Sequence, residues 1–256
     1  MMMTVSVVSV LFLLTVSLSA EKSSADVLPL DMAKDSVDDA YDGCKDAMNK
    51  VVLSKYMEHE KKNTPGFSAA WNNALNKCSK DGLDKNQSAA IYLYTGNPEK
   101  NKNCSFREFN TATRNGKKAY KSENFKFYTL FFFLTDAVQQ LNQKQNACLT
   151  TYRRTNVTFQ TDVFNKTVRF GSFTSTSLNN DSVRFGNRSC FEIYTCFGAS
   201  VQNYSKFQHE SEVLIPPYEV FNVTSIEKKT WCEVVYKLNS SETKRSDLNC
   251  AKIVPS

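Results

Sequence analysis

The chain has 256 residues, of which 41% are hydrophobic and 23% are charged, and its formal net charge is +6 at pH 7. This length is enough for one sizeable domain or two modest ones. Basic residues are mixed with acidic ones and gather only in pairs, such as Lys61-Lys62 and Lys228-Lys229. Such pairs are typical of a solvated surface, so the composition disfavours a nucleic-acid partner.

Residues 1–20 have the pattern of a cleaved secretory signal peptide. An apolar stretch from Val5 to Leu14 is followed by small residues, although the usual basic residue before the stretch is missing. The stretch is too short for a comfortable membrane span, which leaves a signal anchor as the alternative interpretation. Cleavage after Ser19 or after Ala20 fits equally well. We therefore expect a secreted, extracellular protein.

Apolar stripes at helical spacing predict helices in the first half of the mature chain. They cover residues 37–52, 70–78 and 127–141. Asp35 and Ser36 are expected to cap the first helix, with Asp38 and Asp39 in its first turn. The second helix should stop near Gly82. The third stripe is rich in phenylalanine and is expected to be core rather than a ligand-binding surface.

Alternating β-branched and aromatic residues predict strands in the second half. They cover residues 168–176, 191–197, 218–223 and 231–236. Pro216-Pro217 should interrupt pairing between two of these strands. Helices followed by strands favour an α+β fold over alternating βαβ units. No linker or repeat is visible, so we expect one domain over 21–256, mainly helical over about 26–145 and mainly β over 146–250.

Cysteines and glycosylation sequons agree with an exported chain. The cysteines number eight, and an even number in such a chain favours disulfide bonds. No Cys-x-x-Cys pair occurs, so the spacing indicates no zinc site and no metal is expected. No hydrophobic tail follows Trp231, so we expect neither a glycolipid anchor nor a membrane span in the mature protein. Asn-x-Ser/Thr sequons begin at Asn86, Asn103, Asn156, Asn165, Asn180, Asn187, Asn203, Asn222 and Asn239.

Several familiar catalytic patterns are missing. The two histidines are His59 and His209. His59-Glu60 lacks the second histidine of a metalloprotease helix, and no phosphate-binding glycine loop of the Walker or Rossmann type occurs. No Gly-x-Ser-x-Gly motif accompanies either histidine, which disfavours a serine hydrolase.

Short polar motifs in the second half carry the candidate chemistry. They are Thr151-Tyr-Arg153, Phe173-Thr-Ser175-Thr-Ser177 and Glu210-Ser-Glu212. Each motif alone is more often an ordinary surface feature. In this order, they resemble the Arg–Ser–Glu-x-Glu signature of the arginine-specific ecto-ADP-ribosyltransferases. Further similar segments are Leu30-Asp-Met-Ala33, Asp35–Asp39, Tyr41–Cys44, Ala90–Thr95, Arg107–Asn110, Cys196-Phe-Gly198 and Glu212–Pro217.

The resemblance covers roughly residues 28–250 and implies a fold, an activity and a substrate. The implied fold is a helical N-terminal half packed on a β-sandwich-like core with an NAD cleft. The implied activity is cleavage of NAD⁺ and transfer of its ADP-ribose to arginine side chains of extracellular proteins. NAD⁺ would then be a consumed substrate, and no permanently bound cofactor is expected.

The family also implies a role for each site residue. Arg153 would hold the pyrophosphate, because a guanidinium fork suits phosphate oxygens. Glu212 would hydrogen-bond the ribose and stabilise the developing oxocarbenium ion, with Ser175 orienting both. Glu210 would orient the acceptor guanidinium and assist its deprotonation. Tyr94 and the backbone near Arg154 would help to seat the nicotinamide end.

The spacing of the two glutamates is compatible with those roles. On a strand, Glu210 and Glu212 would point to the same side and Ser211 to the other. The sequence departs from the family pattern at Arg154, where a glycine is typical, and at Ser172, where a longer polar residue is common. Both residues are nevertheless expected to lie in the NAD-binding site. A bulky cation at 154 could narrow the nicotinamide pocket or add a phosphate contact.

The resemblance also implies the disulfides Cys44–Cys250 and Cys148–Cys196. For the remaining cysteines we expect Cys78–Cys104 and Cys190–Cys232, a choice that the sequence does not decide, because eight cysteines allow about a hundred pairings. Two alternatives to a transferase stay open. One is an NAD⁺ glycohydrolase, in which water replaces arginine. The other is a catalytically silent, secreted binding module on the same fold.

Overall fold

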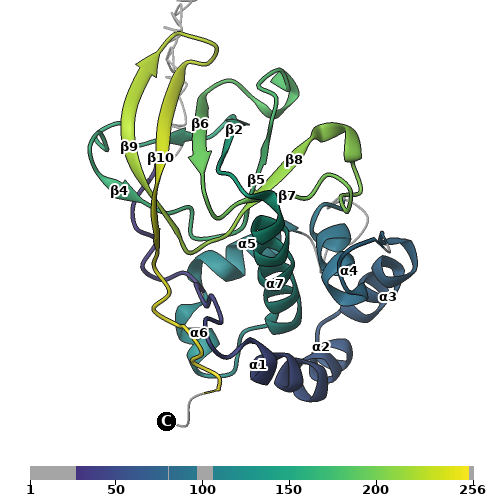
Figure 1. Cartoon of the computed structure of the whole chain (residues 1–256). Helices are drawn as coiled ribbons and strands as arrows, with labels where there is room; N and C mark the ends of the chain where they lie inside the picture. Colours follow the sequence, from purple (N-terminus) through teal and green to yellow (C-terminus); the bar gives the residue numbers. More distant parts are fainter. Residues whose placement is uncertain (1–26, 80, 97–105, 254–256) are drawn as a thin grey trace, which may run out of the picture.

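The computed structural model describes residues 27–79, 81–96 and 106–253. The expected signal peptide therefore lies outside the described residues. The expected α+β class is confirmed, with the helices gathered below a twisted sheet in Figure 1. The helices are α1 (Lys45–Val51), the π-helix η1 (Val52–Tyr56), α2 (Met57–Asn63), α3 (Phe67–Lys77), α4 (Lys85–Tyr94), α5 (Phe106–Asn115), α6 (Lys117–Lys121) and α7 (Tyr128–Gln145). No helix in these ranges is long and apolar enough to cross a membrane.

Strands and short 3₁₀ turns follow α7. The strands are β2 (Leu149–Thr155), β3 (Thr158–Phe159), β4 (Thr167–Val168), β5 (Thr174–Ser177), β6 (Ser189–Thr195), β7 (Ala199–Ser200), β8 (Glu212–Ile215), β9 (Glu219–Lys228) and β10 (Val234–Lys244). The 3₁₀ turns are η3 (Val183–Phe185) and η4 (Gln208–Glu210). A short strand at the start, β1 (Val27–Leu28), pairs with β3.

One mixed sheet carries most of the second half. Its strand order is β4-β9-β10-β6-β2-β5-β8-β7. The β10–β6 pair is parallel, and the other neighbours are antiparallel. Pro216-Pro217 separates β8 from β9, which lie far apart in the strand order. The chain therefore leaves one end of the sheet after β8 and returns near the other end.

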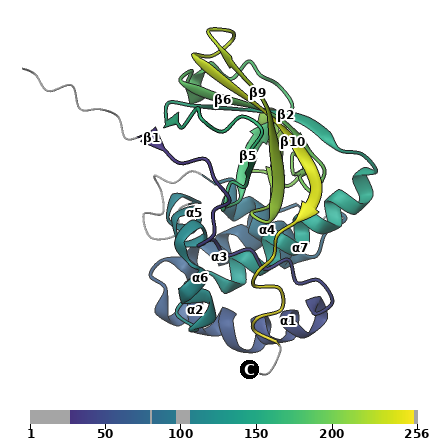
Figure 2. The ribbon, with the colours of Figure 1, turned by 90° about the vertical axis from the view of Figure 1, so that its left-hand side faces the viewer.

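Helix α7 runs through the centre of the molecule and supports the sheet (Figures 1 and 2). Its residues Phe131, Phe132 and Phe133 are buried in one cluster with side chains of the other helices. Leu214 of β8 and Phe173, which directly precedes β5, belong to the same cluster. The expected core role of this phenylalanine-rich helix is confirmed.

The predicted first helix starts later than expected. Residues 35–44 contain no helix, and α1 begins at Lys45. Asp38 and Asp39 are fully buried instead of lying in a first helical turn. Asp38 accepts from Arg169 at 2.9 Å and from the backbone of Leu248 at 3.0 Å. These carboxylates satisfy distant donors in the tertiary structure, which local helix signals do not reveal.

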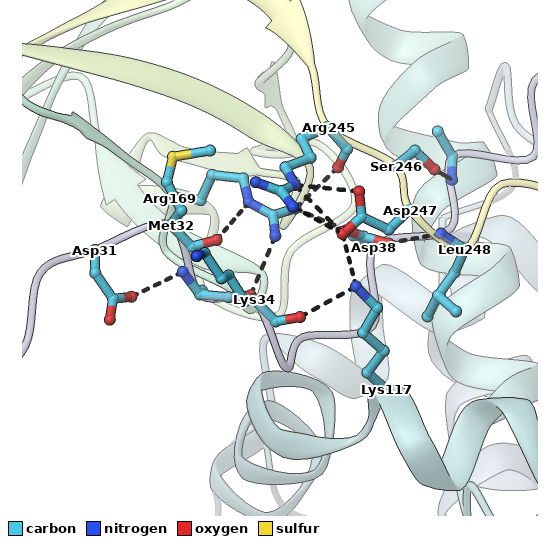
Figure 3. A network of polar contacts seen from close by, with 12 residues as sticks. Asp31, Met32, Lys34, Asp38, Lys117, Arg169, Arg245, Ser246, Asp247 and Leu248 are labelled. Atoms are coloured by element: carbon cyan, nitrogen blue, oxygen red, sulfur yellow. Dashed lines mark hydrogen bonds and ion pairs between the residues drawn. The ribbon is translucent and has the colours of Figure 1, made fainter.

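Figure 3 shows the polar network around Arg169. Its guanidinium donates to Asp38 and to the carbonyl oxygens of Met32, Ala33 and Arg245. Both side chains of the Arg169–Asp38 pair have no exposed surface. The network joins the N-terminal segment, the chain after β4 and the C-terminal segment. A buried charge needs such complete pairing, because an unpaired one would be strongly destabilising.

The strand expected over 168–176 is interrupted. It forms β4 and β5, with a turn between them at which Gly171 has φ +68°. A Cβ atom on Gly171 would lie 2.4 Å from the Cβ of Ala33. The tight approach of the N-terminal segment therefore breaks the strand. The strand expected over 231–236 starts later than predicted, at Val234, and continues as β10 to Lys244.

Within the described residues, three disulfides tie the elements together. They are Cys44–Cys250, Cys148–Cys196 and Cys190–Cys232, the pairs expected above. The first holds the start of α1 to the C-terminal segment, and the second holds the start of β2 to the end of β6. Cys104 lies outside the described residues, and with it the expected Cys78–Cys104 pair.

Candidate active site

Arg153 projects from β2 at the place where that strand separates from β5. The ladder between β2 and β5 consists of the single pair Tyr152–Ser177. The guanidinium of Arg153 donates from Nη1 to the carbonyl oxygen of Ser175 at 2.6 Å. A side chain therefore bridges the strands where backbone pairing stops. Burial lowers the pKa of Arg153, but a guanidinium stays charged at neutral pH.

Glu212 is the first residue of β8, and its side chain is buried, with 6% relative exposure. Its backbone lies opposite Ser177 of β5, and Ser175 lies opposite Leu214. Ser205 donates to its carboxylate at 3.1 Å. Burial raises the pKa of Glu212, while hydrogen bonds from Ser175 and Ser205 act against that rise. No described residue forms a direct ion pair with this carboxylate. A buried carboxylate held by hydroxyl groups suits the stabilisation of a positive charge that develops during a reaction.

Tyr94, at the C-terminal end of α4, reaches the same place from the helical layer. Its hydroxyl donates to the carbonyl oxygen of Phe173 at 2.9 Å and accepts from Asn110 Nδ2 at 3.1 Å. Burial raises its pKa, and the charges of Glu212 and Arg153 act on it in opposite directions. The helix begins with a capping box, in which Asp84 and Gln87 satisfy each other's backbone donors. That cap sets the first residue of α4 and therefore the position of Tyr94 at the end of the helix.

Ser172 is buried and accepts from Arg114 Nη2 at 2.8 Å. Arg114 lies on α5, and its positive charge reaches the Arg153 guanidinium, whose pKa it lowers. Sequence reasoning missed Arg114. The available signal was its position four residues after Asn110, which places both residues on one face of a helix. Two guanidinium groups at one site make a suitable place for a diphosphate.

Glu210 does not share a strand with Glu212, and the expected i, i+2 alternation is wrong. Glu210 ends the 3₁₀ turn η4, and Ser211 has φ +46° and ψ +46° in the left-handed region. That conformation turns the chain before β8 begins. The Glu210 carboxylate forms an ion pair with Arg184 Nη2 at 2.6 Å. Burial raises the pKa of Glu212, and the charge of Glu210 adds to that rise.

Arg154 points away from this group of residues. Successive side chains alternate along β2, so Arg153 and Arg154 project to opposite faces. The Arg154 guanidinium lies 4.7 Å from the Trp231 ring centroid and donates from Nε to the carbonyl oxygen of Asn180 at 2.7 Å. The side chain therefore does not narrow the site, contrary to the concern raised by the missing glycine.

The structure thus brings together residues from α4, β2, β5 and β8. Tyr94, Arg153, Ser175 and Glu212 interact with one another, and Ser172 joins them through Arg114. A cavity of about 460 Å³ lies next to Ser205, but its lining does not include Arg153, Ser175 or Glu212. The arrangement offers a cationic end and a buried carboxylate, with a second carboxylate at the rim.

Comparisons with known proteins agree with this arrangement. The family model described as NAD:arginine ADP-ribosyltransferase matches residues 30–246. The chain is 33% identical over 238 residues to NAD(P)(+)–arginine ADP-ribosyltransferase 1 of Gallus gallus, which covers 88% of this chain and 73% of the relative. It is 31% identical over 240 residues to ecto-ADP-ribosyltransferase 5 of Rattus norvegicus, covering 88% and 76%.

A solved structure is similar over almost its whole length. The eukaryotic mono-ADP-ribosyltransferase ART2.2 superposes with a TM-score of 0.72 at 28% identity, covering 87% of this chain and 98% of that chain. A mutant of ART2.2 in complex with NAD superposes with a TM-score of 0.70 at 26% identity, with the same coverage.

Proposed function

The chain belongs to the NAD:arginine ADP-ribosyltransferase family, and from this we propose that it cleaves NAD⁺ and transfers the ADP-ribose to arginine side chains of proteins. One observation carries the proposal. Arg153, Ser175 and Glu212 come from separate strands, and each interacts with another member of the group. In the complex of the related ART2.2 mutant, NAD is the bound molecule.

Bond cleavage at NAD⁺ needs two kinds of stabilisation, and the described residues can provide both. Arg153 and Arg114 would bind the pyrophosphate, because guanidinium groups pair well with phosphate oxygens. Glu212 would hydrogen-bond the ribose and stabilise the positive charge that develops as nicotinamide leaves with the bonding electrons. Ser175 would hold the carboxylate in position, and Tyr94 would line the nicotinamide end.

Transfer to arginine would depend on Glu210. Its carboxylate, at the rim of the site, would orient the acceptor guanidinium and take the proton that this group loses on attack. The bond from the guanidinium nitrogen to the anomeric carbon would form as the bond to nicotinamide breaks. Nicotinamide leaves as a neutral molecule, so one proton is released for each transfer.

One observation favours a glycohydrolase as the second candidate. Arg184 already pairs with Glu210. As long as no acceptor arginine displaces Arg184 from this carboxylate, water would be the acceptor of the ADP-ribose. The silent binding module loses its main support, because the side chain of Arg154 faces away from the site.

We further propose that the protein acts outside the cell. The disulfides support this, since such bonds persist in oxidising compartments. The name of the similar rat protein also describes an ecto-enzyme.

The test uses protein secreted from eukaryotic cells, labelled NAD⁺ and the arginine analogue agmatine. Nicotinamide release together with an ADP-ribosyl-agmatine adduct would support the transferase. Nicotinamide release without an adduct would favour the glycohydrolase. If the folded, disulfide-bonded protein released no nicotinamide, both activities would be refuted and the binding module would become the preferred interpretation.

A further inference from the structure

The carboxylate of Glu210 is held by an arginine of the protein itself. Arg184, in η3, donates from Nη2 to Glu210 Oε1 at 2.6 Å. The same guanidinium lies 4.8 Å from the centroid of the Phe185 ring. The side chains of Arg184 and Glu210 are 57% and 24% exposed, so the pair lies at the rim of the site. An incoming guanidinium would meet Glu210 from this solvent-facing side.

The backbone on the Arg184 side of the pair is well anchored. Gly186, directly after η3, has φ +122°, and a Cβ atom there would lie 2.4 Å from the carbonyl carbon of Thr155. The amide of Arg188 donates to the carbonyl oxygen of Thr155 at 3.0 Å. The turn that carries Arg184 is therefore fixed against the end of β2.

The backbone on the Glu210 side is anchored as well. The Ser177 hydroxyl donates to the Glu210 carbonyl oxygen at 2.8 Å, and the amide of Leu178 donates to that of Ser211 at 3.1 Å. Both partners thus sit on segments attached to the strands of the site. Their pairing follows from the fold and does not require two mobile loops to meet.

We propose that Arg184 determines acceptor affinity by occupying the position at Glu210 that the acceptor guanidinium takes. The inference rests on the proposed function, because the competition matters only if Glu210 receives an arginine. Arg184 holds Oε1 of Glu210, and an acceptor guanidinium that pairs with both carboxylate oxygens needs Oε1 as well, so bidentate binding of the acceptor displaces Arg184. The like charges of the two guanidinium groups also disfavour a shared carboxylate. Arg184 thereby weakens acceptor binding and favours water when arginine is scarce.

The size of this effect is limited by solvent. Exposed ion pairs are weak, so displacing Arg184 changes acceptor affinity by about two- to fivefold. The difference should shrink at high ionic strength, because salt screens an exposed pair.

The experiment compares Arg184→Ala with Arg188→Ala, using NAD⁺ and agmatine as substrates. Both variants remove one positive charge from the same segment, and Arg188 is exposed. We expect the KM for agmatine to fall about two- to fivefold in Arg184→Ala, with the change in KM rather than in kcat. Arg184→Lys should lie in between, because a lysine keeps the charge but loses the guanidinium fork. Arg188→Ala should leave the KM for agmatine as in the unaltered protein.

The outcomes separate this inference from the proposed function. If the unaltered protein forms the agmatine adduct and Arg184→Ala leaves the KM unchanged or raises it, the Arg184 inference alone is overturned. An equal fall in KM for Arg188→Ala would also overturn it, since net charge would then explain the effect. If the unaltered protein forms no adduct, the proposed transfer fails and the inference fails with it.

Discussion

Replacing Glu212 by glutamine separates the role of its charge from the role of its shape. Glutamine has nearly the same size, and a serine hydroxyl can donate to it or accept from it. The contacts with Ser175 and Ser205 can therefore persist after the change. What disappears is the negative charge that would face the developing cation on the ribose.

The two expected effects of Glu212→Gln have different signs. Removing one preorganised electrostatic partner of a transition state costs about 2.7–4 kcal/mol, so kcat for nicotinamide release should fall about 10²- to 10³-fold. Stability should not fall, because burial raises the pKa of Glu212 in the folded protein. An acid with a raised folded-state pKa loses its contribution to stability as the pH rises through that pKa. Glutamine does not ionise, so at neutral pH the variant does not suffer this loss of stability. Below the unfolded-state pKa of Glu212 the glutamate is neutral as well, so the substitution gives no gain in stability there.

The assay measures nicotinamide release and thermal unfolding for Glu212→Gln and for the control Glu233→Gln. Glu233 is exposed, so the control makes the same chemical change without altering a buried group. We expect the control to match the unaltered protein in both measurements. Turnover of Glu212→Gln within about threefold of the unaltered protein would refute the assigned role. A lower melting temperature for this variant at neutral pH would refute the argument from burial.

Further variants test the other parts of the site and the fold. Glu210→Gln should lose at least tenfold in agmatine transfer while NAD⁺ hydrolysis stays measurable, since only the acceptor would need this carboxylate; equal loss of both activities would contradict the role. Arg154→Gly should leave kcat within about twofold, because the side chain packs on Trp231 outside the site; a large gain would show that the arginine obstructs the site after all. Arg169→Met should lower the free energy of unfolding by about 3–5 kcal/mol in denaturant titrations, because it leaves the buried Asp38 carboxylate unpaired. Adding Asp38→Leu should restore part of that loss, and no recovery would count against the buried-charge explanation.

Long periodic segments were predictable, and short ones were not. Helices α3 and α7 and strands β6 and β9 lie where the residue pattern predicts them. Helices α4, α5 and α6 were not predicted as helices, although the capping box that starts at Asp84 was a readable signal for α4. The π-helix η1 and the two-residue strands depend on packing, which a local pattern does not contain.

The candidate site shows the same division. Arg153, Ser175 and Glu212 could be proposed from a resemblance of short motifs in the right order. Ser205 could not, because its hydrogen bond to Glu212 acts through a turn. Arg114 was missed despite its helical spacing from Asn110, because its contact with Ser172 joins segments far apart in the chain. The position of Glu210 was misjudged because the left-handed conformation of Ser211 ends the alternation that a strand would have imposed.

The sequence by itself determined the α+β class and the phenylalanine-rich core helix, because both depend on side-chain periodicity, which is a local property. The charged residues proposed for the site came from the resemblance of short motifs in a particular order. Only the tertiary structure decided which way each charge points. It turned Arg154 away from the site, buried Asp38 against Arg169, and placed Arg184 on the carboxylate of Glu210. Such pairings follow from strand order and burial, because a charge takes the partner that the folded chain brings to it.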